Sequence, residues 1–484
     1  MVTWYDREAS QAGGKNLHIR LRFWGAARNV TGSQYLLEVS DVRLLVDCGL
    51  YQERELRGRN WAPFPQPPDT INCVLLTHAH VDHCGLLPKL VREGFRGKIY
   101  CTKATSEIAQ FILLDAAKLQ EEDAEFKKRR HEREGRRGPF PEIPLYTVDD
   151  AKACLPLFSG VEYGQPLPIG DNIEATFYDA GHVLGSSIIK VTVRQGGETR
   201  TIIFSGDVGR WDRPILQDPR VFTTTDYVVV ESTYGDRVSE EPLDVGDRLA
   251  EIVNATCKAG GNIVVPSFAL QRAQEVLYYL NELLIEERIP ELRVFLDSPL
   301  AINITEVFKR HSELFDLKMK RLLRHNRSPF DFPGLKMVET VEESKELNHI
   351  AGTVVIIAGS GMCTGGRIKH HLVTNISRPE STILFVGYQA EGTLGRHIVG
   401  GARRVRILGQ MYTVRAGIEQ IHGFSAHADR DGLFRWLSGL VTAPKHVFVT
   451  HGENKAAENF GEFLREKTGW EVSVPEYGSE TLLE

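Results

Sequence analysis

The sequence lacks any apolar run long enough to cross a membrane. No run approaches the roughly 18 residues that a span requires, and residues 1–8 lack the apolar core of a signal peptide. Its seven cysteines stand singly, without a Cys-x-x-Cys pair, which argues against a disulfide framework or a thiolate metal site. The formal net charge of -6 excludes a general attraction to polyanions. We therefore expect a cytoplasmic protein that binds nucleic acid, if at all, through local positive charge or bound metal.

The chain does contain enough apolar sequence for a sizeable core. It has 484 residues, of which 42% are hydrophobic and 25% charged, as in ordinary globular proteins. After a polar lead-in at residues 1–16, short apolar strands mix with helices up to about residue 235. Helices then alternate with apolar strands up to about residue 417, which predicts parallel pairing in a second domain. Periodicity leaves open which domain residues 418–484 join.

One segment, residues 127–137, has an unusual composition. It reads KKRRHEREGRR and precedes three prolines. Such a run is typical of a solvated helix end followed by a mobile loop, but it could also form an arm that contacts phosphates. The sequence does not decide between these two roles.

The strongest chemical signal is the string HAHVDH at residues 78–83, directly after a predicted strand. Alternate residues of an extended segment point the same way, so His78 and His80 can reach one ion. The next turn then brings Asp82 and His83 to another ion, which predicts a two-metal site. Imidazole and carboxylate ligands without thiolates favour Zn²⁺, with Mn²⁺ or iron as substitutes.

Two ions need more ligands than this turn supplies, and further acids and histidines stand where other predicted strands end. Sites on α/β scaffolds form at such strand ends. Any single one of these residues could be a turn cap or a satisfied core polar group, but so many in one chain favour a shared site. They are Asp47, His182, Asp207, Glu231 and His451.

These residues resemble the metallo-β-lactamase superfamily, whose fold is an αββα sandwich with metals at its edge. Residues 231–235 (ESTYG), 424–429 (FSAHAD) and 450–453 (THGE) are similar to motifs A, B and C of the β-CASP nucleases within it. The similarity covers nearly the whole chain from about Leu17. Residues 25–33 (GAARNVTGS) and 358–362 (AGSGM) also resemble the branch that contains the bacterial and archaeal homologues of the endonuclease subunit of the cleavage and polyadenylation specificity factor.

The resemblance implies an α/β fold in which residues 17–235 and 418–484 form the αββα metallo-β-lactamase sandwich. Residues 236–417 would be an inserted α/β β-CASP domain that roofs the metal site. RNA-acting members carry histidine in the third motif where DNA-acting members carry valine. The histidine here is His451, which favours single-stranded RNA as the substrate.

By the same resemblance, two zinc ions would share seven ligands. His78, His80 and His182 would hold one ion, Asp82, His83 and His451 the other, and Asp207 would bridge both. A hydroxide held between the ions would attack the phosphodiester, with Asp82 also part of the catalytic set. Asp47 would orient a ligand imidazole from outside the ligand set.

His427 would be the general acid for the departing ribose oxygen, held and kept protonated by Glu231. The expected phosphate contacts are Ser425, Ser360 and Arg272, each with surface solvation as an equal alternative. The aromatic residues considered for base stacking are Tyr388, Phe424 and Trp436, although core roles are the more common ones for such residues. No KH, S1 or RRM signature was found.

The function predicted from these motifs is a zinc-dependent endoribonuclease. The alternatives are a generic di-zinc hydrolase of the same superfamily, a DNA nuclease and an inert RNA-processing scaffold. Relatives often dimerise, so a homodimer is also considered. The sequence does not indicate the preferred RNA sequence, the physiological transcripts or a 5′ exonuclease activity.

Overall fold

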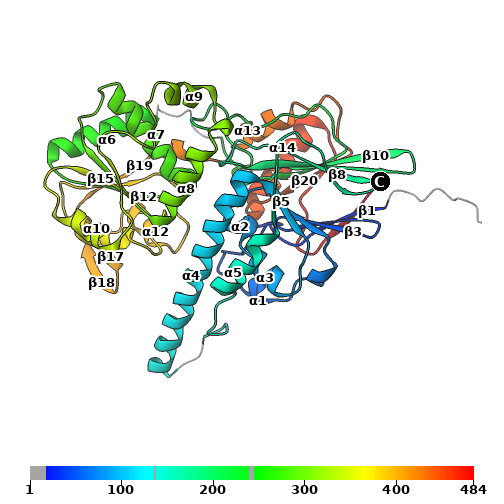
Figure 1. Cartoon of the computed structure of the whole chain (residues 1–484), viewed down its shortest axis with the longest axis horizontal. Helices are drawn as coiled ribbons and strands as arrows, with labels where there is room; N and C mark the ends of the chain where they lie inside the picture. Colours follow the sequence, from blue (N-terminus) through cyan, green and yellow to red (C-terminus); the bar gives the residue numbers. More distant parts are fainter. Residues whose placement is uncertain (1–17, 136–137, 239–244) are drawn as a thin grey trace, which may run out of the picture.

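The computed structural model describes residues 18–135, 138–238 and 245–484 (Figure 1). The expected lead-in at residues 1–16 lies outside this part. Two β-sheets pack face to face in the first part of the molecule, and a third sheet lies beside them in the second part. Among the helices of the described residues, none is both long and apolar enough to span a membrane.

The first sheet begins with the alternating sequence IRLRF of β1 (Ile19–Phe23). Ile19, Leu21 and Phe23 point into the core, and the arginines between them point outward. The strand order is β22–β1–β2–β3–β4–β5–β6. The other strands are β2 (Tyr35–Val39), β3 (Val42–Val46), β4 (Cys73–Leu75), β5 (Lys98–Thr102), β6 (Phe158–Val161) and β22 (Glu480–Leu483).

The second sheet has the order β21–β20–β11–β10–β9–β8–β7. Its strands are β7 (Leu167–Gly170), β8 (Ile173–Asp179), β9 (Ser187–Gln195), β10 (Glu198–Phe204), β11 (Tyr227–Glu231), β20 (His446–Thr450) and β21 (Val472–Ser473). The tail of the chain thus adds β20 and β21 to this sheet and β22 to the first. Leu37, Phe177, Phe204 and Phe448 fill the space between the two sheets.

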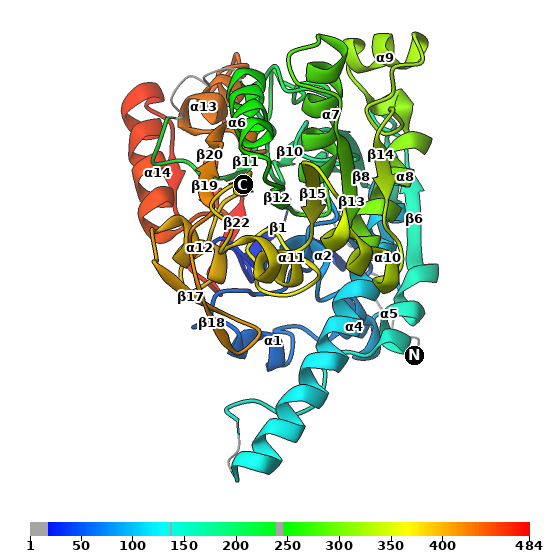
Figure 2. The same cartoon turned by 90° about the vertical axis from the view of Figure 1, so that its left-hand side faces the viewer.

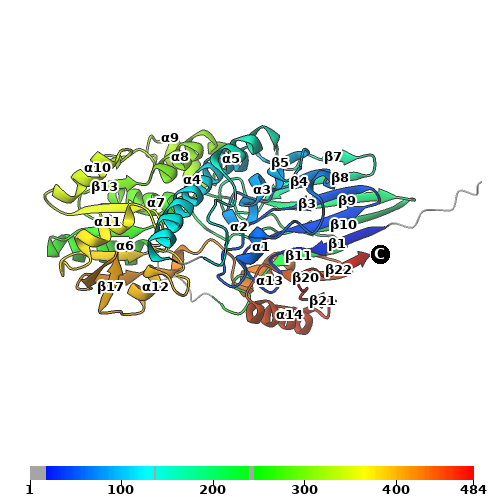
Figure 3. The same ribbon diagram turned by 90° about the horizontal axis from the view of Figure 1, so that it is seen from below.

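Helices cover both outer faces of this sandwich, as Figure 3 shows. The first sheet carries α1 (Gly58–Trp61), α2 (Val81–Cys84), α3 (Leu87–Arg92), α4 (Lys103–Glu134) and α5 (Val148–Cys154). The second sheet carries α13 (Arg430–Leu437) and α14 (Asn454–Thr468). These layers confirm the predicted αββα sandwich.

The third sheet has the order β14–β13–β15–β12–β16–β19, and all its pairings are parallel, as predicted. Its strands are β12 (Ile263–Pro266), β13 (Arg293–Asp297), β14 (Leu335–Met337), β15 (Val354–Ala358), β16 (Thr382–Phe385) and β19 (Gly417–Gln420). Strand β19 lies across the expected domain boundary at residues 417–418. The boundaries themselves stay a prediction.

Both faces of the third sheet are covered, which explains why its strands are apolar throughout. In β15, Val355 and Ile357 pack on one face, and Val354 and Ile356 pack on the other. The helices of this part are α6 (Val245–Ala259), α7 (Arg272–Ile285), α8 (Pro299–Arg310), α9 (Leu317–Arg324), α10 (Val341–Glu346), α11 (Ile368–Asn375) and α12 (Leu394–Val399). A hairpin of β17 (Arg404–Ile407) and β18 (Gln410–Thr413) projects beside them.

Helix α4 runs for 32 residues, and its far end projects from the body (Figure 2). Ion pairs spaced four residues apart support this end, including Arg129–Glu125 and Arg130–Glu134. Residues 127–134 therefore form the last turns of a solvated helix, and residues 136–137 lie outside the described part. The alternative role of the segment, an arm that contacts phosphates, stays untested.

Candidate metal centre

The ends of parallel strands bring the predicted site residues to one edge of the sandwich. Strand β10 pairs in parallel with β11, and β11 with β20. Asp207, Glu231 and His451 therefore leave the second sheet side by side. In the first sheet, β3 and β4 are parallel. Asp47, which follows β3, and residues 77–83, which follow β4, therefore lie at the same edge of the sandwich. Carboxyl ends of parallel strands are where α/β proteins form their sites.

Four side chains form a first set of possible metal ligands: His78, His80, His182 and Asp207. His80 Nδ1 lies 3.0 Å from His78 Nε2 and 3.3 Å from His182 Nε2. Asp207 Oδ2 lies 3.4 Å from His78 Nε2 and 3.3 Å from His182 Nε2. All four ligand atoms thus face one point.

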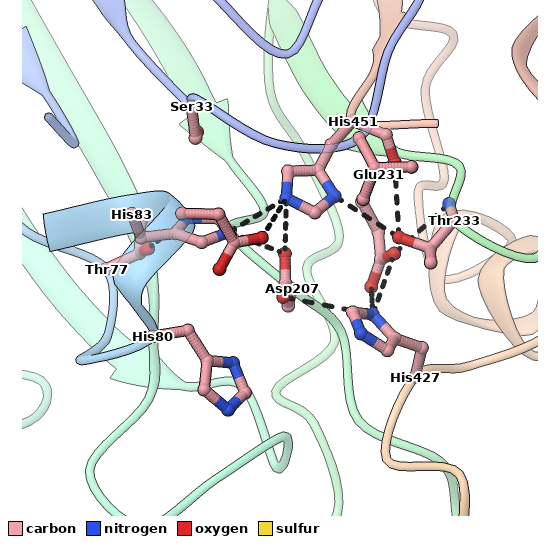
Figure 4. A network of polar contacts seen from close by, with 12 residues as sticks. Ser33, Thr77, His80, His83, Asp207, Glu231, Thr233, His427 and His451 are labelled. Carbon is pink, nitrogen blue, oxygen red and sulfur yellow. Dashed lines mark hydrogen bonds and ion pairs between the residues drawn. The ribbon is translucent and has the colours of Figure 1, made fainter. Parts of the chain in front are cut away.

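A second set consists of Asp82, His83 and His451, again with Asp207 beside it (Figure 4). His83 Nε2 and His451 Nε2 are 2.9 Å apart. Asp207 Oδ1 lies 3.2 Å from the former and 3.6 Å from the latter, and Asp82 Oδ2 lies 3.6 Å from His451 Nε2. The two oxygens of Asp207 therefore face different sets.

The separations in both sets fit a divalent cation. Ligand atoms on a tetrahedral ion at 2.0–2.1 Å lie about 3.3 Å from one another, close to the separations above. Asp207 Oδ1 is buried without a hydrogen-bond donor. Acceptor atoms crowded together in this way need a positive charge between them.

The electrostatics of the first set also suit a metal, which binds neutral imidazole and ionised carboxylate. Burial lowers the pKa of His78 and of His182, and it lowers the pKa of His80 to about 3. Burial raises the pKa of Asp207, but the surrounding imidazoles outweigh it and hold that pKa well below its usual value. In the second set, Asp207 and Asp47 raise the pKa of His83 against the effect of burial.

Asp47 holds His83 from behind. Its Oδ2 accepts a hydrogen bond from His83 Nδ1 at 2.7 Å and lies 3.2 Å from Ser33 Oγ. The Thr77 amide and hydroxyl donate to Oδ1 at 2.8 and 3.0 Å. Asp47 has a φ of 59° and His451 a φ of 49°, in the sparsely populated left-handed region. The backbone N–H of His451 is held there by the Ala26 carbonyl at 2.7 Å.

His427 and Glu231 form a pair beside the first set. His427 Nδ1 lies 3.1 Å from Glu231 Oε2 and 3.8 Å from Asp207 Oδ2. Glu231 is itself fixed, because its Oε1 accepts the N–H of Val208 at 2.6 Å. Burial lowers the pKa of His427, but Glu231 and Asp207 outweigh it and raise the pKa to about 9. The ring is therefore a candidate proton donor.

A buried charge cluster connects the loop before His427 to helix α7. Arg213 donates to the Gly423 carbonyl at 2.5 Å and pairs with Glu275 at 3.2 Å. Arg272 also pairs with Glu275, at 2.5 Å. Arg210 donates to the Gly423 carbonyl at 3.3 Å. One carboxylate thus joins the third sheet's helices to the segment that carries His427.

We expect Glu275→Ala to destabilise the fold, because the buried Arg272 and the partly buried Arg213 lose the carboxylate that neutralises them. Removing one member of a buried ion pair costs about 3–5 kcal/mol. The denaturant midpoint of unfolding should fall clearly. The matched control is Glu306→Ala, whose exposed pair with Lys309 on α8 should be worth less than about 1 kcal/mol. Equal midpoints for the two variants would show that the cluster does not stabilise the fold.

The predicted phosphate contacts come from three separate segments of the chain, and Arg272 lies near Ser425, since its guanidinium is 5.7 Å from the ring of the preceding residue, Phe424. Ser425 caps the short turn His422–Phe424 near His427. Ser360 follows β15, where its hydroxyl accepts the N–H of Thr364 at 2.9 Å. Arg272 is buried against Glu275 and does not face solvent. A role for these residues in binding phosphate stays a prediction.

Sequence reasoning missed several residues that hold the site. Thr77 and Thr233 were inside the recognised motifs, but their side chains were given no role. Thr233 Oγ1 lies 3.2 Å from His451 Nδ1 and fixes that ring as Asp47 fixes His83. Ser33 was likewise in a stretch of family resemblance, residues 25–33, without a role of its own. Arg213 and Glu275 carry no motif signal, and only the folded chain brings them together.

Models of three protein families match successive stretches of the chain. A metallo-beta-lactamase superfamily domain matches residues 36–218, and a Beta-Casp domain matches residues 273–398. A Zn-dependent metallo-hydrolase RNA specificity domain matches residues 411–475.

Curated relatives match over most of the chain. Ribonuclease TTHA0252 from Thermus thermophilus is 38% identical over 460 residues, which cover 95% of this chain and 99% of that protein. The transcription termination factor FttA from Methanosarcina mazei is 30% identical over 94% of this chain and 70% of that protein. FttA from Methanocaldococcus jannaschii is 31% identical with the same coverage.

A solved structure also resembles the chain as a whole. It is the crystal structure of a protein of unknown function from Enterococcus faecalis V583, with a TM-score of 0.53 and 12% identity. The match covers 96% of this chain and 100% of that one. At this identity the likeness concerns the fold alone.

Proposed function

This chain belongs to the β-CASP family of the metallo-β-lactamase superfamily, and from that premise we propose that it is a zinc-dependent endoribonuclease acting on single-stranded RNA. In coarser terms, it is a metal-dependent RNA hydrolase, because its modules are those of metallo-hydrolases and a ribonuclease matches it over nearly its whole length. The observation that carries the finer proposal is the convergence of two ligand sets on Asp207 beside the His427–Glu231 pair.

The two sets suit two ions of the same kind. His78, His80 and His182 would hold one divalent ion, Asp82, His83 and His451 a second, and Asp207 would contact both. Nitrogen and carboxylate donors at tetrahedral separations favour Zn²⁺, with Mn²⁺ as a substitute. Bound there, such ions would supply positive charge for the scissile phosphate and lower the pKa of water toward neutrality.

The chain's own residues then orient the reacting groups. Asp47 and Thr233 each hold the outer nitrogen of a histidine, at 2.7 Å for His83 and 3.2 Å for His451. The inner nitrogens of these rings consequently face the site. Such partners fix both the tautomer and the direction of a ligand ring.

His427 would protonate the departing O3′ of the ribose. Glu231 accepts a hydrogen bond from His427 Nδ1, which leaves Nε2 as the nitrogen that can release a proton to the substrate. The proton lost from Nε2 ends on the 3′-hydroxyl of one product, and the other product keeps the 5′-phosphate. A general acid of this kind speeds a reaction by about 10²- to 10⁴-fold.

RNA is the proposed substrate rather than DNA because His451 stands in the third motif, where RNA-acting members of the family carry histidine. The deciding experiment incubates the zinc-loaded chain with 5′-labelled single-stranded RNA and with DNA of the same sequence. We expect internal cleavage of the RNA only, with 5′-phosphate and 3′-hydroxyl ends. Cleavage of the DNA at a similar rate, or 2′,3′-cyclic phosphate ends, would contradict the proposal.

We expect Asp47→Asn to weaken metal binding in the second set without removing a ligand. The neutral amide no longer makes His83 a more basic ligand, and loss of such a partner typically costs 10- to 100-fold in metal affinity. Competition with a chelator measures this affinity. The control is Asp41→Asn, an exposed aspartate between β2 and β3. Equal metal affinities in the two variants would show that Asp47 does not support metal binding.

A further inference from the structure

The loop that follows the carboxyl end of β19 in the third sheet leads to His427 beside the metal centre. Strands β16 and β19 are parallel neighbours, and the N–H of Ile421 donates to the Phe385 carbonyl at 3.0 Å, just past their ends. The chain runs from there to His427 in six residues. Tyr388 lies three residues after Phe385, the last residue of β16. It is therefore in a loop at the same edge of the sheet as the loop that leads from β19 to His427. Ligands bind at such edges in α/β domains.

Exposed aromatic rings and bare glycine backbone lie along this edge. Phe268 follows β12 and is 38% exposed. Its ring rests against two glycines, since a Cβ would approach it to 2.7 Å at Gly361 and to 3.0 Å at Gly387. Tyr388, the residue after Gly387, is 56% exposed. The edge thus offers two accessible rings on neighbouring loops.

The loop that presents Tyr388 is fixed by the next residue. Gln389 is buried, and its amide Nε2 donates to the Gly361 carbonyl at 2.9 Å and to the Gly387 carbonyl at 3.1 Å. These bonds join the loop after β16 to the loop after β15. A ring on a fixed backbone loses little conformational entropy when a ligand covers it.

Groups around Tyr388 connect it to the reacting centre. The Tyr234 ring lies 5.8 Å from the His427 ring, and the Arg237 guanidinium lies 5.1 Å above Tyr234. Burial raises the pKa of Tyr388, Glu453 and Tyr234 raise it further, and Arg396 and Arg237 lower it. Aromatic rings with arginines beside them are the usual surface for unpaired nucleic acid.

We propose that Tyr388, with Phe268 beside it, is a stacking platform for an unpaired nucleobase of the RNA close to the scissile phosphate. The inference rests on the proposed ribonuclease function and adds a base contact to it. Both faces of a base inside a duplex are already stacked, so this contact would favour single strands. Every base has a π-face, so it would also tolerate many sequences.

The other aromatic residues that the sequence suggested do not compete for this role. Phe424 is fully buried against Tyr279 and Arg272. Trp436 is 3% exposed, and its indole N–H donates to the Arg220 carbonyl at 2.8 Å. Both rings belong to hydrophobic clusters and have no free face for a base.

The test compares Tyr388→Ala with Tyr388→Phe in the full, zinc-loaded chain on 5′-labelled single-stranded RNA. We expect Tyr388→Ala to raise KM by about 5- to 150-fold, the effect of one lost base–aromatic stack, while kcat stays close to that of the wild type. Tyr388→Phe keeps the ring and should behave as the wild type does. Zinc content and the unfolding midpoint establish that both variants are folded.

The same RNA with single abasic positions then identifies the base. In the wild type, one abasic position near the cleavage point should raise KM by a similar factor. In Tyr388→Ala, the same position should add almost nothing, because the stack is already lost. This series also tests the contact in the wild type alone, without depending on any variant.

Three results would overturn the inference while leaving the proposed function intact. They are a KM for Tyr388→Ala equal to that of the wild type, a fall in kcat without a change in KM, and abasic effects that are fully additive with the substitution. If the wild type cleaves no RNA, the proposed function itself fails and the inference fails with it. That outcome is visible before any variant is made.

Discussion

Replacing Asp207 with alanine is expected to lower RNA cleavage by at least about 10³-fold and to reduce bound zinc in both ligand sets. Its two carboxylate oxygens face different sets, Oδ2 toward His78 and His182 and Oδ1 toward His83 and His451. Loss of one preorganised electrostatic group already costs about 10²- to 10³-fold. Loss of a group shared by two ions should cost more.

Metal analysis of the purified variant, together with its rate on single-stranded RNA, checks this expectation. Asp431→Ala is the matched control, because that carboxylate is exposed on α13 and lies outside both ligand sets. It should keep full zinc content and rate. An Asp207→Ala chain that binds two zinc ions and cleaves RNA normally would show that this carboxylate is not shared between two ions.

His427→Ala should lower the rate of RNA cleavage without lowering the zinc content, whereas Asp207→Ala should lower both. Zinc content should stay at the wild-type value, because His427 is outside both proposed ligand sets, whereas the rate should fall by about 10²- to 10⁴-fold. The pair with Glu231 at 3.1 Å explains the size of the effect, since it fixes the ring for proton transfer. The exposed His422, five residues earlier, offers the control His422→Ala, which should change neither quantity.

A change of leaving group separates proton donation from other roles of His427. If the scissile O3′ is replaced by sulfur, the departing thiolate needs little protonation, so His427→Ala should cleave this RNA almost as fast as the wild type does. A variant that stays equally impaired on both substrates would contradict the assignment of His427 as the general acid. A parallel loss of zinc would instead place His427 among the ligands.

The local structure of the chain was largely predictable because its signals are local. Strand β2 at residues 35–39 and β15 at residues 354–358 are short runs of mostly β-branched residues and leucine, the local pattern that predicts strands in these parts of the chain. The parallel third sheet followed from helices that alternate with fully apolar strands. The full length of helix α4, which ends at Glu134, is harder to predict, because its charged second half lacks the apolar stripe by which helices are recognised.

The candidate site was predictable where a motif carries the chemistry. The string at residues 78–83 indicated a two-metal site by itself. The strand ends suggested five further members of the site, namely Asp47, His182, Asp207, Glu231 and His451. The family resemblance was needed to give His427 and His451 their roles. The assignment of each side chain to a metal or to the proton transfer stays a proposal, as do the cytoplasmic location and a homodimer.

Contacts between distant residues could not be predicted from the sequence. Glu275 meets Arg213 across 62 positions, and Thr233 meets His451 across 218. Neither pair has a spacing that sequence periodicity can detect. Tyr388, Phe424 and Trp436 were also indistinguishable as stacking candidates, because exposure is a property of the packed chain. The structure leaves only Tyr388 of these three exposed.

The most direct measurement is a zinc titration of the metal-free chain in which bound zinc and the rate of RNA cleavage are recorded on the same samples. We predict that binding saturates at two zinc ions per chain and that cleavage of single-stranded RNA rises with occupancy to its maximum at that ratio. A chain that binds no zinc, or that cleaves RNA equally well without any divalent metal, would contradict the proposed two-ion centre.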